Sequence, residues 1–161
     1  MSIKEVELLE KKFLSDSSPE EISLIKSRVY RHTEIKSLII YEQVPYPTKF
    51  SYIIINEEVK RLMQEYPGFN NPYYILGDET HAKTRVDSEG RAYLREYMKD
   101  LPGLKHIAVV TGKNIILNYL AKFITGSNPQ YSISFHKQLD EALKHISLKI
   151  IADNVQSSKE N

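Results

Sequence analysis

The sequence predicts an α/β protein with a mostly parallel sheet of four or five strands and helices packed on it. Short apolar runs at 73–76 and 106–110 are typical of strands that are buried on both faces. Each run is followed by a segment in which apolar residues recur at helical spacing. Because strands alternate with helices along the chain, we expect crossover connections and parallel pairing.

The segment 72–98 is the centre of this prediction. Its apolar run ends at Gly77, and from Thr84 onward the apolar residues recur at helical spacing. Three residues that favour a helix start crowd together there: Asp87, Ser88 and Glu89. An acid or hydroxyl at this point can accept hydrogen bonds from the free N–H groups of the first turn. A loop between a strand end and a helix start is where open α/β folds place functional groups.

Three elements are expected before this segment. An N-terminal extension, 1–19, carries an amphipathic pattern that indicates a helix, packed on the domain or docking a partner. The β-branched and aromatic residues of 21–30 and 34–44 favour a hairpin that adds edge strands. The apolar face of 51–65 predicts a helix.

Three further elements are expected after it. Residues 115–123 have the pattern of a helix, 131–135 alternate as a strand, and 137–148 form an apolar face at helical spacing. The main domain is therefore expected over 20–150, and 151–161 is expected to be a polar C-terminal tail.

Composition excludes several classes of function. The 161 residues carry a formal net charge of +1, so no broad electrostatic attraction to nucleic acid or anionic membrane is expected. There is no cysteine, which excludes disulfides, thiol nucleophiles and cysteine metal sites and fits a reducing cytoplasm. No apolar run reaches membrane-spanning length. We expect a cytoplasmic protein without a nucleic-acid or membrane partner.

The residues with catalytic potential do not form a known catalytic pattern. Asp78 and Asp87 flank one loop and could hold Mg²⁺ or act as acid and base, but solvated charge is the favoured interpretation. The sequence TGKN at 111–114 lacks the first glycine and the final Ser or Thr of a phosphate-binding loop. The five histidines show no metal-binding spacing, although His81 could pair with Asp78. We expect no catalytic residue, no cofactor and no metal, and therefore no enzyme.

Three phrases together resemble the STAS superfamily, and especially its SpoIIAA-like branch: YYILGDETHAKTRVDSEGRAYLREYM, LKHIAVVTGKNIILNYLAKFITG and YSISFHKQLDEALKHI. The resemblance covers roughly 35–148. In anti-sigma factor antagonists of this superfamily, an Asp-Ser pair at the start of the helix after the central strand carries a serine that a partner kinase phosphorylates. Asp87 and Ser88 match that pair, and Gly90 matches the glycine two residues later, whereas Glu89 departs from the usual small or hydroxyl residue.

The resemblance implies a non-enzymatic protein-interaction module in bacterial signalling, regulated by phosphorylation of Ser88. The implied partner is a regulator or a kinase-type anti-sigma factor. Apart from the resemblance, the amphipathic N-terminal segment could form a homodimer. The expected partner-binding residues lie on the central loop and helix start: Asp78, His81, Asp87, Glu89 and Arg91. One alternative is that Asp87 or Ser88 only caps the helix. Another is that apolar faces at 52–55 and 115–123 line a lipid or small-molecule cavity. The likeness of SpoIIAA-like folds to the lipid-carrying CRAL-TRIO fold suggests this second alternative.

Overall fold

A single mixed sheet of five strands organises the computed structural model, which describes residues 18–65, 72–84, 86–98, 101–112 and 130–160. The first strand pairs antiparallel with the second, and all later neighbours pair in parallel. The strands follow the order of the chain across the sheet: β1 (Val29–Arg31), β2 (Leu38–Glu42), β3 (Tyr73–Asp78), β4 (Leu104–Val110) and β5 (Ser132–His136). The predicted α/β class with a mostly parallel sheet is confirmed.

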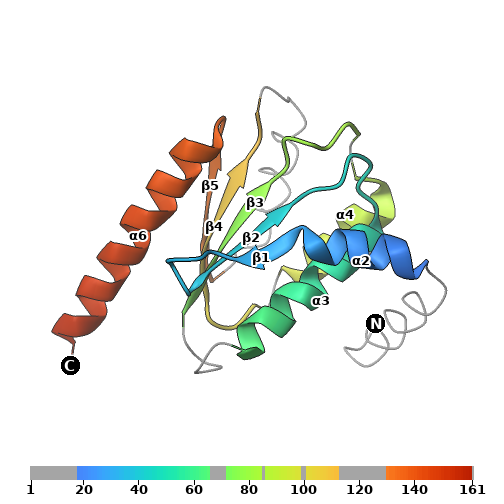
Figure 1. Ribbon diagram of the computed structural model, residues 1–161. Helices are drawn as coiled ribbons and strands as arrows, with labels where there is room; N and C mark the ends of the chain where they lie inside the picture. The colour runs from blue at the N-terminus through green and yellow to red at the C-terminus, as the bar shows by residue number, and fades with distance from the viewer. Residues whose placement is uncertain (1–17, 66–71, 85, 99–100, 113–129, 161) are drawn as a thin grey trace.

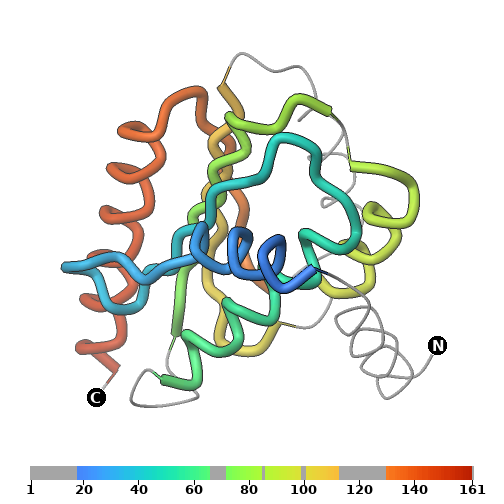
Figure 2. The backbone as a smooth tube through the Cα atoms, turned by 45° about the vertical axis from the view of Figure 1, so that its right-hand side comes forward, coloured from blue at the N-terminus to red at the C-terminus, as the bar shows by residue number. Residues whose placement is uncertain are grey.

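Helices cover both faces of this sheet (Figure 1, Figure 2). The described helices are α2 (Pro19–Ser27), α3 (Lys49–Glu65), α4 (Ser88–Tyr97) and α6 (Leu139–Lys159). The first three lie on one face, as expected when right-handed crossovers join neighbouring parallel strands in order. The last helix follows β5 and covers the other face. Among the described helices, none is long and apolar enough to cross a membrane.

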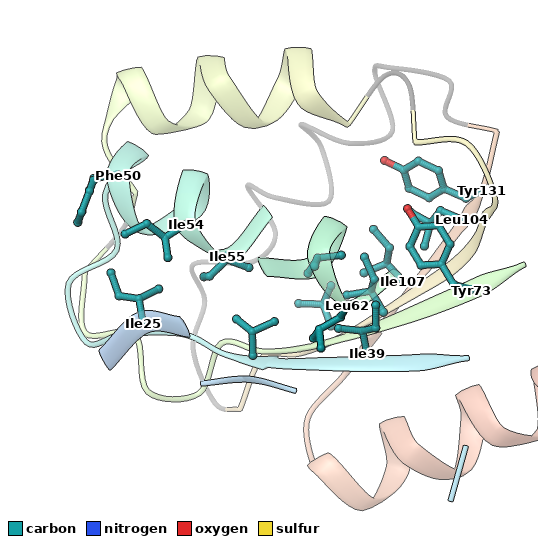
Figure 3. Packing of buried hydrophobic residues seen from close by; sticks show 14 residues of the cluster. Ile25, Ile39, Phe50, Ile54, Ile55, Leu62, Tyr73, Leu104, Ile107 and Tyr131 are labelled. Atoms are coloured by element: carbon teal, nitrogen blue, oxygen red, sulfur yellow. The ribbon is translucent and has the colours of Figure 1, made fainter. Parts of the chain in front are cut away.

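Among the described residues, one hydrophobic core lies on each side of the sheet, and a smaller third cluster lies between α3 and α4. Alternate residues of β2 divide between the two cores on the sheet: Ile39 packs with the α3 side, whereas Leu38 and Ile40 pack with the α6 side. On the α3 side, Ile54 and neighbouring residues of α3 contact the inner strands (Figure 3). Because both faces are covered, β3 is buried at every position, which explains its continuous apolar run.

The predicted hairpin is half correct. β1 and β2 do pair antiparallel, but the first predicted strand, 21–30, is helix α2 as far as Ser27, and only its end belongs to β1. The helix begins because the Ser18 hydroxyl accepts from the Glu21 N–H and Pro19 occupies the first turn, where no N–H is needed. Ile25 is its one buried residue, so the apolar pattern there was too sparse to show the helical period.

The last helix is longer than expected. It was predicted to end at 148, and 151–159 were assigned to a polar tail, but α6 continues to Lys159. Two contacts involve a polar residue of this extension: the Tyr74 hydroxyl donates to Asp153 Oδ2 over 2.7 Å, and Lys149 Nζ lies 3.8 Å from Asp153 Oδ1. The predicted helices within 1–17 and 115–123 lie outside the described residues.

Gly77 is required by the packing of Tyr41. The two residues are direct partners in the β2–β3 register, and a Cβ at position 77 would lie 2.4 Å from Tyr41 Cζ. A side chain there cannot be accommodated unless the tyrosine ring moves.

We therefore predict that Gly77→Ala lowers the free energy of unfolding by about 1–3 kcal/mol, the usual cost of overpacking. Urea unfolding would measure it. In a Tyr41→Leu background the same substitution should cost much less, and the double-mutant cycle removes the separate cost of losing Tyr41. An equal cost in both backgrounds would show that the ring is not the obstacle.

Candidate functional site

The candidate site lies where the parallel strands end together. The last paired residues form one row across the sheet: Glu42, Asp78, Val110 and His136. The pairing continues one step into the loops, since Gln43 N–H donates to Asp78 O over 2.8 Å and Glu79 N–H donates to Val110 O over 3.0 Å. The following loops leave from this common edge, which in open α/β sheets is the usual place for binding groups.

A buried acid, Glu79, lies at this edge. Only 7% of the residue is exposed, and the Tyr41 hydroxyl donates to its Oε1 over 2.8 Å. Burial raises the pKa of the Glu79 carboxyl to about 7, with a smaller increase from the nearby charge of Asp78, although polar contacts to Tyr41, Gln43 and Tyr52 act in the opposite direction. Glu79 therefore exchanges its proton near neutral pH.

The two tyrosines beside Glu79 come from different elements. Tyr41 belongs to β2 and Tyr52 to α3. Burial, followed by the charge of Glu79, raises the pKa of both hydroxyls well above their usual range. Both therefore remain protonated and can act as hydrogen-bond donors. The cluster joins β2, α3 and the end of β3 into one polar junction.

Gln43 completes this junction with a spare donor. The residue is fully buried, and its Oε1 accepts from the Val44 N–H over 2.9 Å. Its Nε2 makes no hydrogen bond of normal geometry within the described part of the chain. Its amide is nevertheless close enough to Glu79 to lower the pKa of that carboxyl. The Gln43 amide therefore lies beside Glu79 without a well-aligned hydrogen bond to it.

Asp78, predicted to bind a partner, has a local structural role. The residue is buried, and its Oδ1 accepts from the Thr80 N–H over 3.0 Å and from the Thr80 hydroxyl over 2.6 Å. These bonds fix the turn that leaves the sheet. His81 follows on the exposed side of that turn, and no hydrogen bond between the described residues joins it to Asp78.

The start of α4 is capped as one of the alternatives predicted. Asp87 has extended backbone angles, and its Oδ1 accepts from the Gly90 N–H over 2.7 Å. Ser88 is the first residue of the helix, and both Ser88 and Glu89 are exposed. The cap is therefore Asp87, which leaves Ser88 on the surface.

Close packing holds this helix start in place. A Cβ on Gly90 would lie 2.4 Å from Val86 Cγ2 and 3.2 Å from the backbone N of Lys49, so α4 begins tightly against the start of α3. The exposed Arg91 folds back and donates from Nη1 to Val86 O over 2.7 Å. Lys83 N–H donates to Pro45 O over 2.6 Å, which ties the β3–α4 loop to the loop before α3. Ser88 is therefore presented from an anchored segment.

The arrangement does not assemble a metal centre. Among the described residues, no three His, Asp or Glu side chains are placed to hold a metal ion. Asp78 orders a turn and Asp87 caps a helix, so each carboxylate has its own structural bond. Of the loop 111–114, only Thr111 and Gly112 are described, and Gly112 adopts a φ of 61°, in the left-handed region that favours glycine.

Glu79 was not among the predicted site residues. Its side chain is buried against a tyrosine 38 residues earlier in the chain, a contact that the neighbouring residues do not reveal. The available signal was its place directly after a fully buried strand that ends at the expected binding edge. Residue type alone does not distinguish it from exposed Glu89.

We predict that Glu79→Gln weakens the pH dependence of the free energy of unfolding. Because the folded-state pKa lies above the ordinary value of 4.5, the folded state holds the proton more tightly, and stability is lost as pH rises through about 7. The free-energy difference between wild type and variant should change by about 3 kcal/mol between about pH 4 and pH 8, measured by urea unfolding. The exposed control Glu89→Gln should keep the pH dependence of the wild-type free energy of unfolding. If Glu79→Gln kept it as well, Glu79 would not be the source of that dependence.

Comparison with protein-family models, curated proteins and solved structures found no significant match to this chain.

Proposed function

We propose that this protein is a non-enzymatic interaction module that binds a protein partner through the 79–87 loop and the first turn of α4, and that phosphorylation of Ser88 regulates this binding. The observation that carries the proposal is the placement of Ser88. It is exposed at the first position of α4, while Asp87 and Gly90 on either side are held by a cap and by close packing. A kinase or a partner can reach the hydroxyl without disturbing the core.

The charge around Ser88 indicates how phosphorylation would act. A phosphate adds about −1.5 to −2 charges and meets the free N–H groups of the helix start, which favour it. It also meets the exposed carboxylates of Asp87 and Glu89, which repel it. We infer that the modification leaves the fold intact and adds negative charge beside Asp87 and Glu89, so that a partner docked there is released.

The resemblance to SpoIIAA-like anti-sigma factor antagonists supports the same function, since their regulatory serine corresponds to Ser88. The proposed partner is accordingly a regulator of the kinase-type anti-sigma class. His81, Glu89 and Arg91 are exposed around the docking surface. Asp78 is buried and accepts hydrogen bonds from Thr80, which fixes the turn that leads into this surface.

A lipid or small-molecule cavity receives less support. The apolar residues proposed to line it, Tyr52 to Ile55, are between 0% and 5% exposed and pack in the hydrophobic cores around α3. The second proposed wall, 115–123, lies outside the described residues.

We predict that Ser88→Asp reduces capture of the partner about tenfold or more, because a like charge is added at the docking surface, whereas Ser88→Ala retains capture. An affinity pull-down with quantitative mass spectrometry, performed from the cells that make the protein, would measure both. The same experiment can detect phosphorylated Ser88 directly.

The matched control is Ser158→Asp, which adds the same charge at an exposed serine of α6. It should leave capture unchanged. Equal capture by wild type, Ser88→Asp and Ser88→Ala would contradict regulation at Ser88, and equal loss with Ser158→Asp would show a nonspecific charge effect.

A further inference from the structure

A chain of histidines and serines lies beneath α6, far from the docking surface in sequence. His106 on β4 is 3% exposed; its Nδ1 lies 2.6 Å from Ser132 Oγ and its Nε2 lies 2.8 Å from Ser134 Oγ. Ser134 Oγ also lies 2.8 Å from Nε2 of His136. Both serines and His136 come from alternate positions of β5 and therefore share one face of the sheet.

All the hydrogen bonds of this series can form at once when both imidazoles are neutral. His136 Nε2–H can donate to Ser134, whose hydroxyl then donates to His106 Nε2. His106 Nδ1–H can in turn donate to Ser132, whose hydroxyl lies 3.5 Å from Lys105 O. A second proton on His106 would turn Nε2 from an acceptor into a donor. Nε2 would then face the Ser134 hydroxyl, which already donates to it, so these hydrogen bonds would have to rearrange.

Helix α6 places a third imidazole, that of His145, beside these two histidines. The His145 ring of α6 lies 5.3 Å from the His106 ring and 4.9 Å from the His136 ring, measured between centroids. Burial, then His145, Lys149 and His136, lowers the pKa of His106 to about 4, while Asp153 has the opposite effect.

The pKa of His136 is also lowered, and two of the causes are the same. Burial and then His145 lower its pKa, while Glu141 raises it. From β3, the facing titratable group is Tyr74, whose hydroxyl is bonded to Asp153. Among the described residues, α6 and β3 thus both place titratable groups at the cluster, and Glu141 and Asp153 only partly offset the effects that lower the two pKa values.

We propose that His106 and His136, packed against the His145 ring of α6, form an acid-sensitive latch that holds α6 on the sheet at neutral pH and releases it when His106 and His136 take up protons. The attachment of α6 is narrow, since its buried residues are Ala142, Ile146 and Ile150. Release would uncover the apolar face of the sheet beneath it: Leu38, Ile40, Leu76, Ala108 and Val110.

The direction of the pH response follows from the lowered pKa of His106. Because the folded-state pKa of His106 lies below its ordinary value of 6.5, its stabilising effect is present above about pH 6.5 and is lost as pH falls toward 4. Glu79 acts in the opposite direction on global stability, since its pKa is raised. Local release of α6 can therefore be distinguished from unfolding of the whole domain.

Hydrogen–deuterium exchange of the full chain tests this proposal. After correction for the intrinsic rate, exchange of amides in α6 should increase roughly tenfold or more between pH 7 and pH 5, while exchange of α3 changes little or falls. His106→Gln should remove most of this increase. If that variant does not fold, His136→Gln, at a half-buried position, should reduce the increase instead.

The control His81→Gln, at an exposed histidine of the β3–α4 loop, should retain the full response. The proposal is overturned if α6 and α3 lose protection together, if α6 shows no response to pH, or if the variants at positions 106 and 136 respond like wild type. A loss of response in His81→Gln would overturn it as well, because the effect would then not belong to the cluster.

Discussion

The contact between Tyr41 and Gly77 is the constraint on which the carboxyl edge of the sheet depends. The tyrosine ring occupies the space that a side chain at position 77 would fill, and its hydroxyl then reaches Glu79 beyond the end of β3. Tyr52 of α3 contributes to the same polar junction. One missing side chain thus allows two strands and a helix to meet around a buried acid, and the loop that leads to Ser88 starts from this fixed point.

The two faces of the sheet respond to protons in opposite directions. On the α3 side, burial raises the pKa of a carboxyl, so acid favours that packing. On the α6 side, burial and neighbouring cations lower the pKa of His106, so acid opposes that packing. The physical cause, desolvation of the charged form, is the same on both faces, and only the sign of the charge differs. The domain therefore combines a base-sensitive junction at the strand ends with an acid-sensitive contact under its last helix.

Sequence reasoning succeeded where the information is local. The buried runs of β3 and β4 and the cap at Asp87 follow from residue types within a few positions of one another. It failed where a partner lies far away in the chain. Asp153 looked like part of a polar tail because its partner, Tyr74, is 79 residues earlier. Glu79 and Glu89 are the same residue type in one short segment, and only the pairing of strands decides that the first is buried and the second exposed. The histidine cluster shows the same limit, because its alternating positions on β5 are visible in the sequence but their pairing with His106 is not.

We propose that a partner docks at the start of α4 and not elsewhere. The exposed apolar residues on the outside of α6, among them Ile151 at 58% exposure, offer the clearest competing surface. Site-specific photo-crosslinking from position 89 and from position 151, in the cells that make the protein, tests the claim most directly. We expect a partner to be crosslinked from position 89 and none from position 151; crosslinking from position 151 alone would show that the partner docks on α6 instead.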